Sequence, residues 1–298
     1  REILRMGVYQ IMHMDSVPDS AVCNEAVKLA NKRKFTNLKG FVNGVLRNIS
    51  REKDKIKFPD KKDGFCAYAS VRYSMPEWIV NYLCEEYGED ETERIFEGFL
   101  KADRGVSVRC NVSKAEPQEV YDMLKKQGIS VKKSELFDYA FSIDDFDRLQ
   151  DVEALKKGYI QVQDFSSILA GHIPEIKGGE NIIDICAAPG GKTLHIADRL
   201  NDRKLNGGGK IISCDLTDAK TALIKENVER NGFENVSVVK NDALAFKKEW
   251  EDTADIVIAD LPCSGLGVIG KKCDIKYKTS IEDINALSEI QREILKNV

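Results

Sequence analysis

The sequence has 298 residues, of which 42% are hydrophobic and 32% are charged, and its formal net charge is −4. This is the composition of an ordinary globular protein of about two domains. No run of about 18 consecutive apolar residues occurs, so we expect no membrane-spanning helix and no membrane partner.

The eight cysteines show no C-x-x-C spacing, and the three histidines lie far apart in the sequence. This pattern predicts neither a structural zinc site nor a disulfide framework, and we expect no bound metal. Reduced thiols are typical of the cytoplasm, which is where we expect the protein to be located.

The N-terminal region has the pattern of a small all-helical piece. Apolar residues favour helices over residues 3–12 and 21–29, and a third helix over residues 38–49 repeats them at i, i+3, i+4, i+7, i+8 and i+11. Thr36 or Asn37 is placed to cap the third helix. Three helices of this length are too short to bury a large core of their own.

The positive charge is concentrated in one segment. Residues 28–62 hold twelve Lys and Arg against three acids, a balance of +9, whereas residues 1–27 carry −2 and residues 63–298 carry −11. A basic stretch of this size is suited to contact RNA phosphates, with an affinity that depends on salt. A solvated helix followed by a linker is the alternative interpretation.

A charged linker over residues 53–69 separates this region from a small α+β module over residues 70–150. Ser74 and Glu77 have the spacing of a capping box, and Gly88 is expected to end the helix that follows. Further elements are predicted as a helix over residues 91–102, a strand over 106–111, a helix over 117–127 and a strand over 129–132.

Residues 151–298 have the alternating pattern of an α/β sheet. Short apolar strands are predicted over residues 182–185, 210–215, 236–239 and 256–260. Helical patterns separate them, and such an alternation predicts parallel strands in a doubly wound sheet.

The turn after the first of these strands reads D-I-C-A-A-P-G-G-K-T over residues 184–193. It lacks the G-x-G-x-x-G spelling of a dinucleotide site, and no glycine stands where a P-loop has its first one, which argues against an ATPase. Paired glycines and a helix N-terminus still make this turn the expected place for a cofactor.

Three acids follow successive strands at the same end of the predicted sheet. Asp215 is placed to accept the hydroxyls of a ribose, Asp242 an adenine amino group, and Asp260 comes directly after the fourth strand. Acids at these places, without a pyrophosphate-binding turn, favour a nucleoside with a small sulfonium tail. The expected cofactor is S-adenosylmethionine.

Two strings carry a family resemblance. Residues 186–192 (C-A-A-P-G-G-K) and 260–265 (D-L-P-C-S-G), together with Q-D-F-S-S over residues 163–167, resemble the Sun/Fmu/NOP2 group of RNA cytosine-C5 methyltransferases. The resemblance implies a Rossmann-like methyltransferase sheet over residues 151–298. The residues that it implies at the cofactor are Cys186, Ala187, Ala188, Pro189, Gly190, Gly191, Lys192, Asp215, Asp242 and Asp260.

The chemistry explains why a cysteine lies near an acid. Carbon 5 of cytosine becomes nucleophilic when a thiolate adds to carbon 6; after methyl transfer a base removes the carbon-5 proton and the thiolate is expelled. Asp260, near the N3/N4 edge of the ring, favours the protonated ring that accepts the thiolate. The resemblance implies that a later Thr-Cys segment supplies the attacking thiolate and that Cys263 helps to release the product.

No Thr-Cys pair occurs in the sequence. Two alternatives therefore remain: Cys263 is itself the nucleophile, or it is a small buried residue without a chemical role. A complete sheet of this class would need about three more strands, and the sequence opens with Arg1 rather than Met. We expect a chain truncated at both ends, with an incomplete methyltransferase sheet and no activity by itself.

The N-terminal region points to the RNA. The string F-V-N-G-V-L-R over residues 41–47 resembles the end of a NusB-like RNA-binding domain, which assigns residues 1–52 to a NusB-like remnant. The family also carries an RRM-like module where residues 70–150 lie. The expected partner is small-subunit ribosomal RNA, bound by a monomer.

Two other functions remain open, and a third is disfavoured. The target can be tRNA, or the chain can be an RNA-binding module for ribosome assembly without activity. An amino-group methyltransferase would carry Asp/Asn-Pro-Pro-Tyr/Phe after the fourth strand, and the sequence from Asp260 to Cys263 argues against it.

Overall fold

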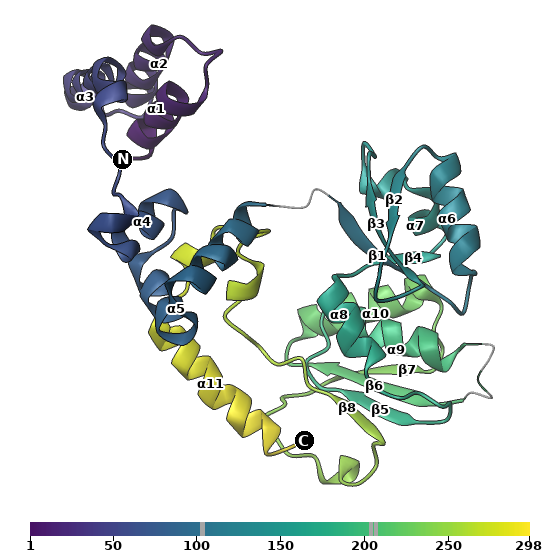
Figure 1. Ribbon diagram of the computed structural model, residues 1–298. Coiled ribbons are helices and arrows are strands. Elements are labelled where there is room, and N and C mark those ends of the chain that lie inside the picture. The colour runs from purple at the N-terminus through teal and green to yellow at the C-terminus, as the bar shows by residue number, and fades with distance from the viewer. Residues whose placement is uncertain (102–104, 203–204, 206–207) are drawn as a thin grey trace. The chain divides into compact units, whose positions relative to one another are not determined.

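The computed structural model describes residues 1–101, 105–202, 205 and 208–298 (Figure 1). The chain divides into two compact units, Arg1–Glu93 and Arg94–Val298, and each is considered by itself. Among the described residues no helix is both long and apolar enough to cross a membrane.

The first unit begins with three packed helices. They are α1 (Glu2–His13), α2 (Asp19–Lys32) and α3 (Lys39–Glu52). Their buried faces form one cluster, in which Leu46 has no exposed surface. Gly7 is required at the closest approach, because a Cβ there would lie 2.8 Å from the Leu46 side chain. The three predicted helices are confirmed.

The predicted cap of α3 is wrong. Residues 36–38 form a short 3₁₀ turn, Leu38 occupies the N-cap position, and no side chain caps it. Thr36 instead donates from its hydroxyl to Asn31 Oδ1 at 3.1 Å. Phe41, on the predicted apolar face, is 60% exposed, because the other two helices cover only the side that holds Val42 and Leu46.

The predicted linker is partly structured. It holds two 3₁₀ turns, Lys53–Lys55 and Lys61–Asp63, and its last residues begin helix α4 (Phe65–Arg72), where Phe65 and Ala69 are buried. Those last residues are helical, contrary to the prediction, because Phe65 and Ala69 supply a short buried face.

Helix α5 (Glu77–Leu100) contains the predicted break. Gly88 has φ +76° and ψ 167°, so it separates two helical stretches, as the sequence predicts. Ser74 does not occupy the N-cap, since the helix begins at Glu77 and Ser74 lies in a turn with φ +52°. The predicted end at Ala102 lies outside the described residues.

The second unit contains an antiparallel sheet with the element order β-α-β-β-α-β of ferredoxin-like folds. Its elements are β1 (Val106–Cys110), α6 (Pro117–Lys126), β2 (Ser130–Lys133), β3 (Ala140–Asp144), α7 (Glu153–Lys156) and β4 (Ile160–Val162). The strand order is β2-β3-β1-β4, and all neighbours are antiparallel. This confirms a small α+β module.

The module extends further along the chain than the sequence predicts. Strand β4 pairs with β1, with Arg109 opposite Gln161, so the predicted boundary at residue 151 falls inside the module. Strands β3 and β4 were not predicted. A three-residue strand has too little alternation to be recognised without its partner.

The second sheet of this unit is parallel and has the order β7-β6-β5-β8. It is built from α8 (Phe165–His172), β5 (Asn181–Asp184), α9 (Gly191–Leu200), β6 (Lys210–Asp215), α10 (Asp218–Asn231), β7 (Val236–Lys240), β8 (Ile256–Ile258) and α11 (Ile281–Leu295). The four predicted strands and their parallel arrangement are confirmed, and β8 ends two residues earlier than predicted. The mixed α/β fold class is confirmed with it.

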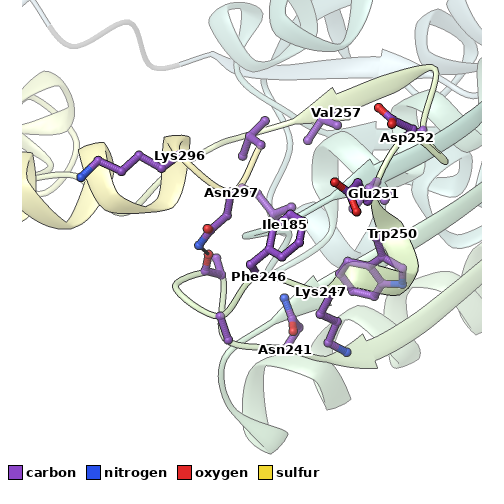
Figure 2. A pocket seen from close by; sticks show the side chains of 15 residues that line it. Ile185, Asn241, Phe246, Lys247, Trp250, Glu251, Asp252, Val257, Lys296 and Asn297 are labelled. Atoms are coloured by element: carbon purple, nitrogen blue, oxygen red, sulfur yellow. Dashed lines mark hydrogen bonds between the residues drawn. The ribbon is translucent and has the colours of Figure 1, made fainter.

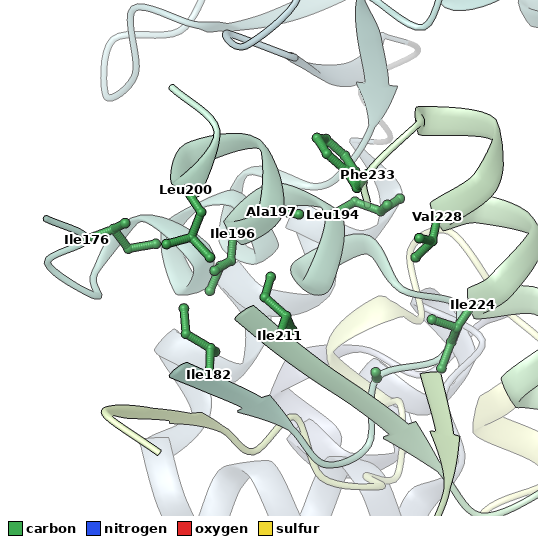
Figure 3. Packing of buried hydrophobic residues seen from close by; sticks show 11 residues of the cluster. Ile176, Ile182, Leu194, Ile196, Ala197, Leu200, Ile211, Ile224, Val228 and Phe233 are labelled. Carbon is green, nitrogen blue, oxygen red and sulfur yellow. The ribbon is translucent and has the colours of Figure 1, made fainter. Parts of the chain in front are cut away.

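Helices α8, α9 and α10 lie on one face of the parallel sheet (Figure 1). The core between them contains Ile182 and Ile211 from the strands, Leu194 from α9 and Ile224 from α10, all almost fully buried (Figure 3). Each such side chain contributes about 1.5–3 kcal/mol of burial free energy. This packing holds the N-terminal turn of α9 against the carboxyl ends of the strands.

Candidate functional site

The turn between β5 and α9 is shaped by local backbone contacts. Gly190 has φ +103°, a left-handed conformation that favours glycine, and its N–H donates to Ala187 O at 2.6 Å. Ala187 N donates to Cys214 O at 2.9 Å, which ties the turn to β6. Helix α9 then starts at Gly191 with its N-terminus facing this turn, a position suited to bind polar or anionic groups.

A cavity of about 300 Å³ lies beside this turn at the carboxyl end of β5. Its lining residues are Val162, Gln163, Asp164, Ser167, Asp184, Cys186, Ala187, Ala188, Pro189, Gly191, Lys192 and Asp260. The structure therefore brings together seven of the predicted site residues. Gly190, Asp215, Asp242 and Cys263 do not line the cavity.

Asp215 supports the turn from behind the cavity. The residue is 3% exposed; its Oδ2 accepts from Ala188 N at 3.0 Å, and its Oδ1 accepts from Leu216 N at 2.8 Å and pairs with Lys220 Nζ at 2.9 Å. Asp242 is exposed, and its Oδ1 accepts from Leu244 N at 3.0 Å.

Lys192 and Asp260 meet at the mouth of the cavity. Lys192 Nζ donates to Asp260 Oδ2 at 2.5 Å, although the two residues are 68 positions apart in the sequence. Cys263 follows three residues after Asp260 and is exposed. The segment between them is held by α11, because Gln291 donates from its side-chain amide to Pro262 O at 2.7 Å.

The two cysteines of the sequence motifs differ in their surroundings. Cys186 is half-buried, and burial, followed by the nearby charges of Asp215 and Asp184, raises the pKa of its thiol to about 11. A raised pKa keeps the Cys186 thiol protonated at neutral pH, which disfavours the thiolate that a nucleophile needs. Cys263 is the exposed thiol of the pair.

Asp184 is a cavity residue that sequence reasoning missed. It has no exposed surface, and Thr193 donates from its hydroxyl to Asp184 Oδ2 at 2.6 Å. The other oxygen, Oδ1, has no hydrogen-bond partner within the part of the chain that the structure describes. Burial raises the pKa of this carboxyl to about 6. An acid ending a buried strand was the available signal.

A second wall of the cavity comes from residues 163–167. Gln163, Asp164 and Ser167 line it, and Asp164 also contacts Lys271 Nζ. The Q-D-x-S-S pattern of the sequence marks this segment, but it gives no reason to place these side chains beside the turn after β5. Only the packing of β4 and α8 beside the parallel sheet does so.

Another cavity, of about 290 Å³, lies where β5 and β8 approach the C-terminal residues (Figure 2). Figure 2 shows Ile185, Phe246 and Trp250 along one side of it and Lys296 and Asn297 along another. None of the predicted site residues lines it, so it is not a candidate for the same chemistry.

Metal-ligating side chains do not gather in the described ranges. Among those residues no group of three or more His, Cys, Asp or Glu side chains could hold a metal ion. The arrangement at the first cavity is that of a nucleoside-type site, with small side chains, a helix N-terminus and acids at strand ends.

Three family models match consecutive parts of the chain. The NusB family matches residues 1–51, the ferredoxin-like domain of RsmF/B-like methyltransferases matches 75–149, and the 16S rRNA methyltransferase RsmB/F matches 173–298. Their order is that of the three regions described above.

Two curated relatives are similar over nearly the whole chain. The probable ribosomal RNA small subunit methyltransferase B of Bacillus subtilis is 33% identical over 302 residues, which cover 100% of this chain and 65% of that protein. The ribosomal RNA small subunit methyltransferase B of Vibrio vulnificus is 30% identical, with 98% and 65% covered. The chain thus spans about two thirds of the length of these relatives.

Solved structures share the fold. The crystal structure of PH0851 has a TM-score of 0.76 at 28% identity and covers 99% of this chain and 65% of that one. The structure of NSun6 from Pyrococcus horikoshii with SFG has a TM-score of 0.64 at 21% identity, with 74% and 79% covered, and this likeness concerns the fold alone.

Proposed function

The chain belongs to the family of the RsmB/F 16S rRNA methyltransferases, and we propose that it serves S-adenosylmethionine-dependent methylation of cytosine C5 in small-subunit ribosomal RNA. The observation that carries the proposal is the cavity in which the turn after β5 faces Asp260, with the exposed Cys263 three residues beyond.

The cavity fits S-adenosylmethionine, the cofactor of this family. Its volume is about 300 Å³, and the small side chains of Ala187 and Ala188 leave room beside the turn. Asp184 Oδ1 is a buried acceptor with no partner among the described residues, which suits an ammonium group. When bound, S-adenosylmethionine supplies an electrophilic methyl group on its sulfonium sulfur.

Asp260 and Lys192 are the residues that would meet the pyrimidine. Their ion pair keeps the Asp260 carboxylate at the mouth of the cavity, where it can contact the N3/N4 edge and favour protonation of the ring. A protonated ring accepts a thiolate at carbon 6 more readily, which makes carbon 5 the nucleophile. Cys263 is assigned to product release, the step in which the carbon-5 proton leaves, the C5–C6 double bond re-forms and the C6–S bond breaks to return the thiolate.

The RNA contact is assigned to the basic segment, residues 28–62, which contains twelve Lys and Arg residues and only three acids. A balance of +9 over 35 positions favours phosphate binding. The second candidate, an RNA-binding or assembly module without activity, draws on the same segment. It predicts salt-dependent RNA binding that survives Asp215→Ala and needs no cofactor.

Calorimetric titration with S-adenosylmethionine tests the cofactor part of the proposal. Saturable binding by the folded chain supports it, whereas no binding favours the assembly module. Because the sequence holds no Thr-Cys pair, we predict that this chain alone does not methylate RNA. Turnover by the chain alone would instead make Cys263 the nucleophile.

The role of Cys263 is tested in a longer form of the protein that includes a Thr-Cys segment. Cys263→Ser should trap a covalent protein–RNA adduct, detected as a denaturant-resistant band, because release is blocked while attack proceeds. Complete loss of methylation without an adduct would assign the attack to Cys263.

A further inference from the structure

Arg109 is a charged residue with no exposed surface in the middle of β1. Its strand neighbours Val108 and Cys110 pack into the core of the antiparallel sheet, so the alternation of the strand directs Arg109 to the opposite face. Burial lowers the pKa of its guanidinium, and the charge of Asp198 opposes this effect. A buried charge must be paired, and its partners show what it holds together.

The first partner is on α9, the helix that begins at the cavity. Arg109 Nη1 donates to Asp198 Oδ2 at 3.0 Å. The same carboxylate accepts from Val112 N at 2.9 Å and from Ser113 N at 3.0 Å. Asp198 therefore fastens α9 to the end of β1, seven residues after the cavity residue Gly191.

The second partner is in the other wall of the cavity. Arg109 Nε donates to Gln163 Oε1 at 3.0 Å, and Gln163 Nε2 donates to Ser167 O at 3.3 Å. Gln163 and Ser167 both line the cavity, whereas Arg109 does not. One guanidinium thus joins α9 and residues 163–167, which come from different parts of the chain.

The pairing is not the arrangement that stability alone favours. Arg109 Nη2 is buried and has no hydrogen-bond partner within the described part of the chain. An apolar side chain of similar volume in place of a buried ion pair is often neutral or stabilising. The presence of Arg109 is therefore better explained by the positions in which it holds α9 and residues 163–167 than by a gain in stability.

We propose that Arg109 is a positioning residue, which sets the two walls of the S-adenosylmethionine cavity relative to each other through Gln163 and Asp198. The inference rests on the proposed function for the identity of the ligand. It gives the ferredoxin-like module a part in cofactor binding, in addition to any contact with RNA.

Two changes separate positioning from stability. Arg109→Met together with Asp198→Asn removes both charges, so that no single buried charge remains. Gln163→Leu keeps the ion pair and removes the hydrogen bonds of the wall residue Gln163 to Arg109 and to Ser167. The control is Leu124→Ala, which opens the core of the same module at a fully buried residue that does not line the cavity.

The measurements are calorimetric affinity for S-adenosylmethionine and the urea unfolding midpoint. Both the Arg109/Asp198 variant and Gln163→Leu should weaken binding about tenfold. A loss of about this size is typical when the hydrogen-bond partner that orients a binding residue is removed. The variant with all three changes should lose about tenfold rather than a hundredfold, because the changes act through one contact. Leu124→Ala should lower the midpoint and leave the affinity of the folded chain unchanged.

Unchanged affinity in the Arg109/Asp198 variant, losses that multiply to a hundredfold, or an equal loss in Leu124→Ala would each overturn the inference. Hydrogen exchange without ligand decides it independently. The amides of residues 164–167 should exchange faster in the Arg109/Asp198 variant than in the wild type. Equal exchange rates in the two proteins would refute positioning by Arg109. If the folded wild type binds no S-adenosylmethionine, the proposed function is contradicted instead.

Discussion

The parallel sheet β7-β6-β5-β8 and the antiparallel sheet β2-β3-β1-β4 both contribute to the cavity, but through different kinds of contact. The parallel sheet contributes backbone: its strand ends and the turn after β5 form one wall through hydrogen bonds between neighbouring segments. The antiparallel sheet contributes residues 162–164 at the end of β4, and behind them a buried charge, Arg109, that reaches α9.

Because the two walls are held by different contacts, substitutions in them should differ in effect. A wall made of backbone depends on glycine conformation and on acids that cap N–H groups, and single substitutions there should have moderate, local effects. A wall held by one buried charge depends on its pairing, and removal of one partner leaves the other without compensation. Four substitutions test this contrast.

The largest effect is expected in the antiparallel sheet. Arg109→Met leaves the Asp198 carboxylate buried without its cation and should lower the free energy of unfolding by about 3–5 kcal/mol. Urea unfolding followed by circular dichroism measures it. Adding Asp198→Asn should restore part of the loss. If Arg109→Met lowers the free energy of unfolding by less than about 1 kcal/mol, the wall held by Arg109 does not depend on its ion pair more than the backbone wall depends on its own contacts.

The next effect concerns a buried acid of the parallel sheet and its pH dependence. Burial raises the pKa of Asp184 to about 6, above the ordinary value of 3.8 for an aspartate. Between these values the unfolded chain binds fewer protons than the folded chain, so this group stabilises the fold below about pH 4 and the contribution is lost as pH rises through 6. The loss amounts to about 3 kcal/mol.

Asp184→Asn lacks this titration. Relative to the wild type, its free energy of unfolding should therefore rise by about 2.5 kcal/mol between pH 4 and pH 8, measured by urea titrations across that range. If the free energies of unfolding of the two proteins change with pH in parallel, Asp184 and the cavity wall around it are solvated.

Asp215→Ala tests the backbone wall through ligand binding. The change removes the acceptor of Ala188 N and should weaken S-adenosylmethionine binding by about 1.5–3 kcal/mol, the range for an unpaired buried group. Calorimetry measures the affinity. Lys220→Ala is the matched control, because it removes only the half-exposed partner of Asp215 and should change the affinity little. Equal affinities for wild type and Asp215→Ala would remove Asp215 from the site.

The smallest effect is expected at the glycines of the turn. Gly190→Ala should cost about 1–2 kcal/mol of unfolding free energy, because φ is +103° and not because space is lacking: the added Cβ would lie 3.5 Å from Ile224 Cγ2. Gly191→Ala is the control, since its Cβ would enter open space in the first turn of α9. Similar unfolding midpoints for the two variants would contradict a special role for Gly190.

Elements with a strong local pattern were predictable. The strands around Ile182, Ile211 and Val257 have apolar runs, and Gly88 and Gly190 adopt the positive φ that only a glycine accepts readily. Elements whose identity depends on a partner were not: the three residues of β4 form a strand because β1 lies beside them, and Thr36 fails as a cap because a 3₁₀ turn intervenes.

The sequence by itself determined the α/β class, the Gly-rich turn after β5 and the family resemblance, because strand, turn and helix are consecutive there and their geometry depends on local backbone preferences. Only the tertiary structure decided that Asp184 and residues 163–167 line the cavity, that Asp215 and Asp242 lie off it, and that Arg109 connects its two walls. These relations join residues as many as 89 positions apart. Packing between sheets sets them, and no local pattern encodes which buried charge meets which partner.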